Sequence, residues 1–232
     1  GMMGEIVAMA ASICKKHDTD PRGVYQNHLD ELKALMTTGI GPAKPKPNVV
    51  LIIADDQGYA DLGFTNTLID VFTPRLDQLA SEGIYLPNAY ATSPICNPSR
   101  VGMITGRYQQ RWGNYYYGGG QGIPDEVVTL PERFKAAGYA TGYFGKVHTG
   151  GPDRKPDAPG FPLNWGFDRF YGTTTGGRTH YLHHSKAAVE EYGKAARQMM
   201  VAPMWDDDQQ IEFDGFTTEA FGSKAREFIA TN

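Results

Sequence analysis

The pattern of hydrophobic and polar positions divides the chain near residue 47. Residues 5–17 and 24–37 have apolar positions at helical spacing, so we expect a helix in each segment. Residues 39–47 (GIGPAKPKP) are rich in Gly, Pro and Lys, which is typical of a linker. We therefore expect residues 1–46 to form a helical appendage with a Gly/Pro linker, and residues 47–232 to form the main domain.

Beyond the linker, patterns typical of strands alternate with patterns typical of helices. The continuous apolar run Val49–Ile53 suits a central parallel strand that is covered on both faces. Residues 84–91 and 139–146 predict further strands. Helices are expected at residues 73–83, 98–106, 129–138 and 217–232. This alternation indicates an α/β fold, a mostly parallel sheet with helices on both faces.

Composition and charge narrow the possible functions only a little. The 232 residues are 41% hydrophobic and 21% charged, as in ordinary globular proteins. The net charge of −4 means that an anionic substrate needs a local cationic site. Two cysteines, Cys14 and Cys96, do not make a disulfide framework, and no apolar run reaches the length of a membrane span.

Asp55 and Asp56 directly follow the first expected strand. Ligands of open α/β sheets bind beyond the carboxyl ends of the strands. Two adjacent carboxylates there are suited to a hard cation such as Ca²⁺ or Mg²⁺. The alternative is an ordinary turn, because the sequence DDQGY has Asp and Gly where turns favour them.

Cys96 lies where a loop is expected to enter a helix. Free backbone N–H groups and the positive end of the helix dipole favour an anion at such a place. Arg100 follows about one turn later and is able to reach the same anion. The alternative is that Cys96 is simply a small buried apolar residue.

Lys146 and His148 lie at the carboxyl end of the strand expected at residues 139–146. A Lys and a His on one side of a chain suit anion binding and general acid catalysis. A surface lysine beside a loop histidine is the alternative.

Two other groups of polar residues are weaker candidates. The acidic run Asp206–Asp208 is expected to be a solvated loop rather than a metal site. The histidines His180, His183 and His184 lack the helical spacing of zinc ligands, although His180 could line a substrate cleft.

Four segments, taken in order, resemble the sulfatase family of the alkaline-phosphatase-like superfamily. They are NVVLIIADDQGYADLG (48–63), CNPSRVGMITGR (96–107), GYATGYFGKVHTG (138–150) and DGFTTEAFGSKAREFI (214–229). The resemblance covers about residues 48–230 and implies the N-terminal part of an alkaline-phosphatase-like catalytic domain. It does not extend to residues 1–46.

The resemblance implies a chemistry for residue 96. In sulfatases this cysteine is oxidised by a maturation enzyme to Cα-formylglycine, whose hydrate attacks sulfur. Asp55, Asp56 and the modified Cys96 would then be ligands of Ca²⁺, with Mg²⁺ as an alternative. The implied substrate is a sulfated carbohydrate or a small aryl sulfate.

The resemblance also implies roles for three further side chains. Arg100 would steady the formylglycine and the charges of the metal site, and Lys146 would bind a sulfate oxygen. His148 would hydrogen-bond the diol and assist the release of sulfate.

The length of the chain departs from the family pattern. Sulfatases are longer, so this chain is expected to hold about half of an active site, to leave the sheet incomplete, and to be weakly active or inactive alone. A phosphodiesterase or phosphonate monoester hydrolase of the same superfamily is the nearest alternative, and a truncated, non-catalytic binding protein is another. Family habit favours a periplasmic or extracytoplasmic location, with a cytoplasmic one as the alternative, and no nucleic-acid partner is expected.

Overall fold

The computed structural model describes most of the chain. The described residues are 16–18, 21–38, 46–68, 70–116, 122–149, 155–176, 204–213 and 215–232. They fall into two compact units, Gly1–Ala54 and Asp55–Asn232. Most of the helix expected at residues 5–17 lies outside the described residues, as do His180, His183 and His184.

The first unit contains two short helices, α2 (Pro21–Asn27) and α3 (Leu29–Thr38). The backbone N–H of His28 donates to the carbonyl of Val24 at 2.9 Å, and the N–H of Leu32 donates to the carbonyl of His28 at 3.0 Å. Helical hydrogen bonds thus continue across the junction, and Val24 is buried. The helical prediction for residues 24–37 is confirmed, with the helix interrupted at His28.

The second unit contains a four-stranded sheet in the order β1-β2-β3-β4. Its strands are β1 (Gly142–Lys146), β2 (Arg169–Thr173), β3 (Met204–Asp206) and β4 (Gln209–Ile211). β1 and β2 run parallel, whereas β2 with β3 and β3 with β4 run antiparallel, so the described sheet is mixed. The third expected strand is confirmed as β1.

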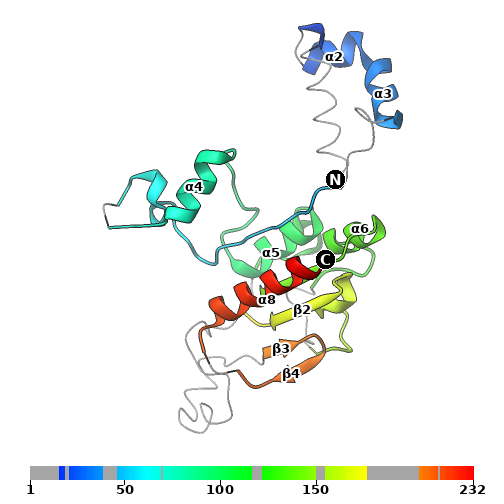
Figure 1. Ribbon diagram of the computed structural model, residues 1–232. Coiled ribbons are helices and arrows are strands. Elements are labelled where there is room, and N and C mark those ends of the chain that lie inside the picture. Colours follow the sequence, from blue (N-terminus) through cyan, green and yellow to red (C-terminus); the bar gives the residue numbers. More distant parts are fainter. Residues whose placement is uncertain are drawn as a thin grey trace. The chain divides into compact units, whose positions relative to one another are not determined.

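Alternation along β1 and β2 gives the sheet two apolar faces. Phe144 is paired in register with Tyr171, and on that face their rings meet Phe228 and Phe221 of α8 (Thr217–Thr231), which lies across the sheet in Figure 1. The neighbouring pair, Tyr143 and Phe170, faces the opposite side. Helices therefore cover both faces, as expected.

The main core lies on the face opposite α8. It joins α5 (Cys96–Thr105) to the sheet through Ile104. The other buried members of this core are Val147, Phe161, Trp165, Phe170 and Trp205. These residues fix α5 beside β1, which decides where the start of α5 lies.

The paired glycines Gly145 and Gly172 bring β1 and β2 together without side chains. A Cβ atom on Gly172 would collide with the main chain of Gly145. Gly145 has a φ of +136°, a conformation that other residues rarely adopt. Glycine at both positions is therefore a requirement of this strand pair.

The helices expected in the main domain are confirmed. They are α4 (Pro74–Glu82), α5, α6 (Leu130–Ala136) and α8. α6 begins at a capping box, in which the N–H of Thr129 donates to the carboxylate of Glu132 at 2.6 Å. Four 3-10 helices complete the described elements: η1 (Tyr59–Asp61), η2 (Gly63–Thr65), η3 (Gln109–Trp112) and η4 (Pro162–Trp165). No described helix has the length and apolar character needed to cross a membrane.

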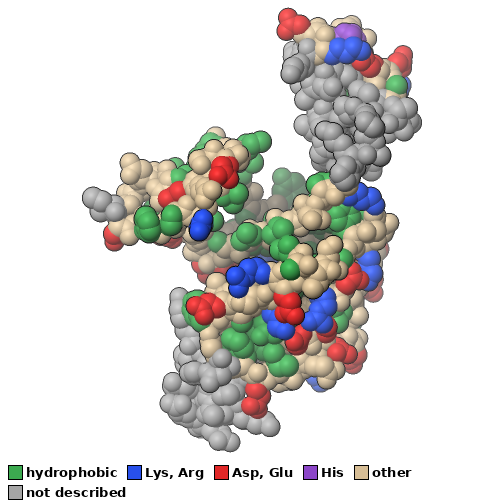
Figure 2. All heavy atoms as spheres, in the orientation of Figure 1, with side chains coloured by type: hydrophobic (Ala, Val, Ile, Leu, Met, Phe, Trp, Pro, Cys, Tyr) green, Lys and Arg blue, Asp and Glu red, His purple; other side chains and the backbone are tan. Residues whose placement is uncertain are grey.

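Two of the expected strands are not formed, and those predictions were wrong. Val49–Ile53 and residues 84–91 contain no strand, and the side chains of Val49–Ile53 are 39–78% exposed. Neither segment has a pairing partner among the described residues, and an apolar run becomes a strand only where another strand accepts its hydrogen bonds. Figure 2 shows further apolar side chains on the surface of the segment that carries α4. Phe72 and Leu79 are among the exposed apolar residues of the chain.

Candidate active site

The first turn of α5 places Cys96 at the start of a helix. Cys96 is the first helical residue and is half-buried. The N–H of Ser99 donates to the carbonyl of Ile95 at 3.1 Å, and the Ser99 hydroxyl donates to the carbonyl of Cys96 at 3.0 Å. These bonds close the first turn, and the helix ends at Gly106 in the left-handed conformation that favours glycine. The sequence expectation of a loop-to-helix junction at Cys96 is confirmed.

His148 lies against the thiol of Cys96. Its Nδ1 is 3.1 Å from Sγ of Cys96, and its side chain is buried. His148 follows the end of β1 and has a φ of +44°, so the chain turns sharply to bring the ring to α5. An imidazole at this distance is able to exchange a proton with the group at position 96.

Gly176 forms one side of the space that His148 occupies. A Cβ atom at position 176 would collide with the imidazole ring of His148. Gly176 was not predicted as part of the site, because a glycine in a Gly-rich stretch does not indicate which neighbouring side chain needs the space. The glycine itself was the one available signal.

Arg100 joins α5 to β1 and to Asp55. Its Nη1 donates to the carbonyl of Lys146 at 2.6 Å and to the hydroxyl of Tyr143 at 3.2 Å, and its Nη2 donates to Oδ1 of Asp55 at 3.1 Å. Arg100 is 7% exposed, so these contacts are made out of bulk water. Such bonds hold Arg100 in one orientation.

Tyr143 is a second residue that the sequence analysis missed as part of the site. Its hydroxyl accepts from Arg100 and donates to the carbonyl of Lys146 at 2.6 Å. Burial raises the pKa of Tyr143, so the phenol stays protonated and remains a donor. The sequence alone indicated only that Tyr143 is an aromatic residue in a strand.

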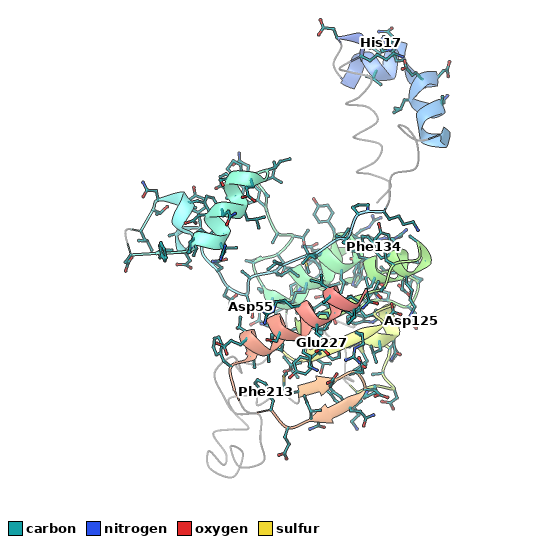
Figure 3. All side chains as sticks on the ribbon, in the orientation of Figure 1. His17, Asp55, Asp125, Phe134, Phe213 and Glu227 are labelled. Atoms are coloured by element: carbon teal, nitrogen blue, oxygen red, sulfur yellow. The ribbon has the colours of Figure 1, made fainter. Side chains whose placement is uncertain are left out.

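Asp55 is neutralised by two cations. Its Oδ2 accepts from Nζ of Lys146 at 2.7 Å, while Oδ1 accepts from Arg100 (Asp55 is labelled in Figure 3). Partial burial alone would raise the pKa of Asp55, but the hydrogen bonds and charges of Lys146 and Arg100 outweigh it and lower the pKa. Asp55 is therefore a carboxylate at neutral pH.

Asp56 is exposed and has a left-handed backbone, with a φ of +58°. A metal ion needs its ligand atoms close to one another. In the described part of the chain, the ligand atoms of Asp55, Asp56 and Cys96 do not all lie close enough together to bind one ion. The two carboxylates suit Ca²⁺ in kind, but a calcium site uses about six to eight oxygen ligands. Asp55, Asp56 and Cys96 alone therefore do not complete a calcium site.

The acidic run Asp206–Asp208 lies at the turn between β3 and β4. Arg169 forms ion pairs with Asp206 and Asp207, and Nζ of Lys224 lies 3.7 Å from Asp206. The backbone N–H of Phe170 donates to Asp207 at 2.9 Å. These carboxylates hold β2, β3 and α8 together, which agrees with a structural role rather than a metal site.

Comparison with known proteins assigns most of the chain to one family. The Sulfatase family model matches residues 47–229. Mouse arylsulfatase J is 31% identical over 224 residues, which cover 95% of this chain and 35% of that protein. Mouse steryl-sulfatase is 38% identical over 175 residues, and pig N-acetylgalactosamine-6-sulfatase is 39% identical over 147 residues.

Solved structures agree. The structure of Ps i-CgsB is 31% identical with a TM-score of 0.69, covering 81% of this chain and 42% of that one. The same protein in complex with k-i-k-neocarrahexaose gives 30% identity and the same TM-score. The α/β fold is thus that of the alkaline-phosphatase-like superfamily, and the chain spans 35% and 27% of the length of the two mouse relatives. On this evidence, the chain belongs to the sulfatase family.

Proposed function

We propose that the protein containing this chain hydrolyses sulfate esters at residue 96. The observation that carries the proposal is that His148 contacts Cys96 at the start of α5, while Arg100 of the same helix and Lys146 both bind Asp55. An imidazole, a guanidinium and an ammonium in one site are suited to a reaction in which negative charge develops on a sulfate group. The names of the related sulfatases support this reaction class.

Conversion of the Cys96 thiol to formylglycine by a maturation enzyme would supply a hydrated aldehyde with two hydroxyl groups, one to attack sulfur and one to lose its proton as sulfate leaves. His148 is placed to take that proton, because its Nδ1 already lies 3.1 Å from Sγ of the same residue. Lys146 would bind a sulfate oxygen, and Arg100 would hold the carbonyl of Lys146 and the carboxylate of Asp55 in place.

Asp55 and Asp56 would contribute carboxylate oxygens to a divalent cation, Ca²⁺ or Mg²⁺, which polarises the bonds of a bound sulfate. A sulfated carbohydrate is the substrate class that we favour over an aryl sulfate. The structure of the similar protein Ps i-CgsB in complex with k-i-k-neocarrahexaose supports that choice. The family habit also leads us to propose a periplasmic or extracytoplasmic location.

The test is to produce the chain together with a formylglycine-generating enzyme and to measure the mass of the peptide that contains residue 96. We expect the loss of H₂S and the gain of one oxygen. Sulfate release from an aryl sulfate and a sulfated oligosaccharide is then compared with phosphate release from the matched phosphate ester. The Cys96→Ala variant gives the background, which matters because this chain alone is expected to turn over slowly.

Each alternative has its own result. An unmodified Cys96 under these conditions would contradict the proposal and favour a non-catalytic binding protein. Faster hydrolysis of the phosphate ester would instead favour a phosphodiesterase or phosphonate monoester hydrolase.

A further inference from the structure

Three side chains of the first unit bring metal-ligand atoms together, before residue 47, where the match to the Sulfatase family model begins. His17, His28 and Glu31 each offer one such atom, and these atoms all lie within 4.8 Å of one another. Within the described residues they are the one group of three or more His, Cys, Asp or Glu side chains with this property. Figure 3 labels His17, and Figure 2 shows histidine beside lysine on this unit.

The helices of this unit explain how the three residues meet. His28 lies at the junction of α2 and α3, and Glu31 follows it at i+3, which places both on one side of the helical turn. His17 is a helical residue that precedes the turn at Asp18, and its Nε2 lies 2.8 Å from Oε2 of Glu31. Its ring stacks on that of His28 with 4.0 Å between the centroids.

The chemistry of the three donors suits zinc. Two imidazole nitrogens and one carboxylate form a three-residue ligand set that zinc sites use while keeping a further position open. Hydrogen bonds from Lys16 and His17 lower the pKa of Glu31, so it is a carboxylate at neutral pH. The stacked rings must turn for both nitrogens to point at one ion, and the side chain of His17 is 30% exposed, which leaves it room to do so.

Lys16 is the group that competes with a metal for Glu31. Its Nζ lies 2.7 Å from Oε1 of Glu31, and its side chain is 64% exposed. An exposed ion pair of this kind contributes little to stability, so a divalent cation is able to displace the lysine. Even after displacement, the positive charge of Lys16 would repel a bound ion.

We propose that His17, His28 and Glu31 form a zinc-binding site that ties residues 16–18 to α3. Its residues lie before residue 47, where the match to the Sulfatase family model begins, and the zinc-binding test does not depend on sulfate hydrolysis. Bound zinc links His17 to His28 and Glu31 and thereby stabilises the first unit.

The experiment is a calorimetric titration of the chelator-stripped full chain with Zn²⁺, and a parallel titration with Co²⁺ followed by visible absorption. We expect His28→Gln and Glu31→Gln to weaken zinc binding by about tenfold or more. Lys16→Gln is expected to bind zinc more tightly than the unaltered chain, because the competing cation is gone. Circular dichroism confirms that each variant keeps its helices.

Other residues of the chain are also able to bind zinc, so matched controls are required. His180, His183 and His184 replaced together by Ala, and Cys96→Ala separately, should leave the high-affinity binding unchanged. Loss of binding in either control, or unchanged binding in His28→Gln, would overturn the proposal. Weaker binding in Lys16→Gln would do so as well, and a gain of affinity there cannot arise from misfolding.

Discussion

The ammonium of Lys146 lies 2.7 Å from the carboxylate of Asp55, so two groups with opposite tasks in the proposed reaction neutralise each other. Lys146 is proposed to bind sulfate, and Asp55 is proposed to bind a cation. While the two groups remain paired, Lys146 cannot fully bind sulfate and Asp55 cannot fully bind a cation. Binding of a cation at Asp55 and release of Lys146 toward an anion are therefore linked events.

Replacing Lys146 by Met should destabilise the chain. Asp55 would keep Arg100 but lose its shorter contact, and the lysine side chain in this pair is only 9% exposed. We expect a loss of about 1–3 kcal/mol in the free energy of unfolding, since a mostly buried charge loses a partner. Urea unfolding at neutral pH measures it.

The matched control is Lys135→Met. Nζ of Lys135 lies 2.6 Å from Asp168, but the lysine side chain is 52% exposed. A solvent-screened pair is expected to contribute less than about 1 kcal/mol. Equal losses in the two variants would contradict the conclusion that the Asp55 pair is shielded from water.

The stability contributed by Asp55 should depend on pH. Its folded-state pKa lies below the ordinary value of about 3.9, so ionisation favours the folded chain. This contribution is complete above the ordinary pKa and is lost as the pH falls through the folded-state pKa. The advantage of the unaltered chain over Asp55→Asn should therefore be constant near neutrality and shrink below about pH 4.

Urea midpoints of both chains between neutral and acidic pH check this. Asp168 also has a lowered pKa, chiefly because of its hydrogen bond with Lys135, but it is common to both chains and cancels in the difference. An advantage that persists unchanged into strong acid would show that Asp55 is not ionised in its pair.

Adding a methyl group at Gly176 should displace His148 from Cys96. The new Cβ would collide with the imidazole ring, so the ring must move. Because Nδ1 of His148 lies 3.1 Å from Sγ, close enough for the imidazole to assist the reaction of the thiol, we expect slower alkylation of Cys96 by iodoacetamide, with His148→Ala giving a similar decrease. The rate is read from peptide mass after timed quenching.

Gly222→Ala is the control for that substitution. A Cβ at position 222 of α8 meets nothing within 4 Å, and alanine favours a helix by about 1 kcal/mol over glycine. Alkylation of Cys96 should be unaffected. A normal rate in Gly176→Ala would instead show that the ring does not depend on this glycine for its place.

Removing the hydroxyl of Tyr143 should loosen Arg100. Tyr143→Phe deletes an acceptor for the guanidinium and a donor to the carbonyl of Lys146 in a buried place. We expect a loss of about 1–2 kcal/mol in unfolding free energy. Tyr108→Phe, at a tyrosine that is 68% exposed, should change stability by less than about 0.5 kcal/mol. Similar values for the two variants would count against a positioning role for Tyr143.

The helices could be predicted from sequence because their signals are local. The Thr-x-x-Glu capping box at Thr129, Pro74 at a helix start and the spacing along residues 217–231 all act within a few positions. Strands depend on distant partners, which sequence patterns do not reveal. The apolar run Val49–Ile53 therefore predicted a strand that is not formed, and β2 was missed because Gly172 interrupts its β-forming residues for the sake of close packing with Gly145.

The residues of the candidate site that have reactive or charged side chains could be predicted from the sequence. Cys96, Arg100, Lys146, His148 and Asp55 all stood out in sequence, and the structure brings them together. Their catalytic roles stay predictions, as does the ligand role of Asp56. Tyr143 was missed because it supports the site through a buried hydroxyl group, and Gly176 was missed because it leaves room for His148. Neither property can be recognised in a sequence.

The wide separation of these residues along the chain sets the order in which the site assembles. Asp55 and Lys146 are 91 positions apart, and Cys96 and His148 are 52 apart. Closing such long loops costs entropy that the hydrogen bonds within α5, each spanning a single helical turn, do not incur. We therefore expect the site to form late, when β1 docks beside α5. Undocking of β1 would separate His148 from Cys96 and Tyr143 from Arg100 in one step, while leaving every hydrogen bond inside α5 intact.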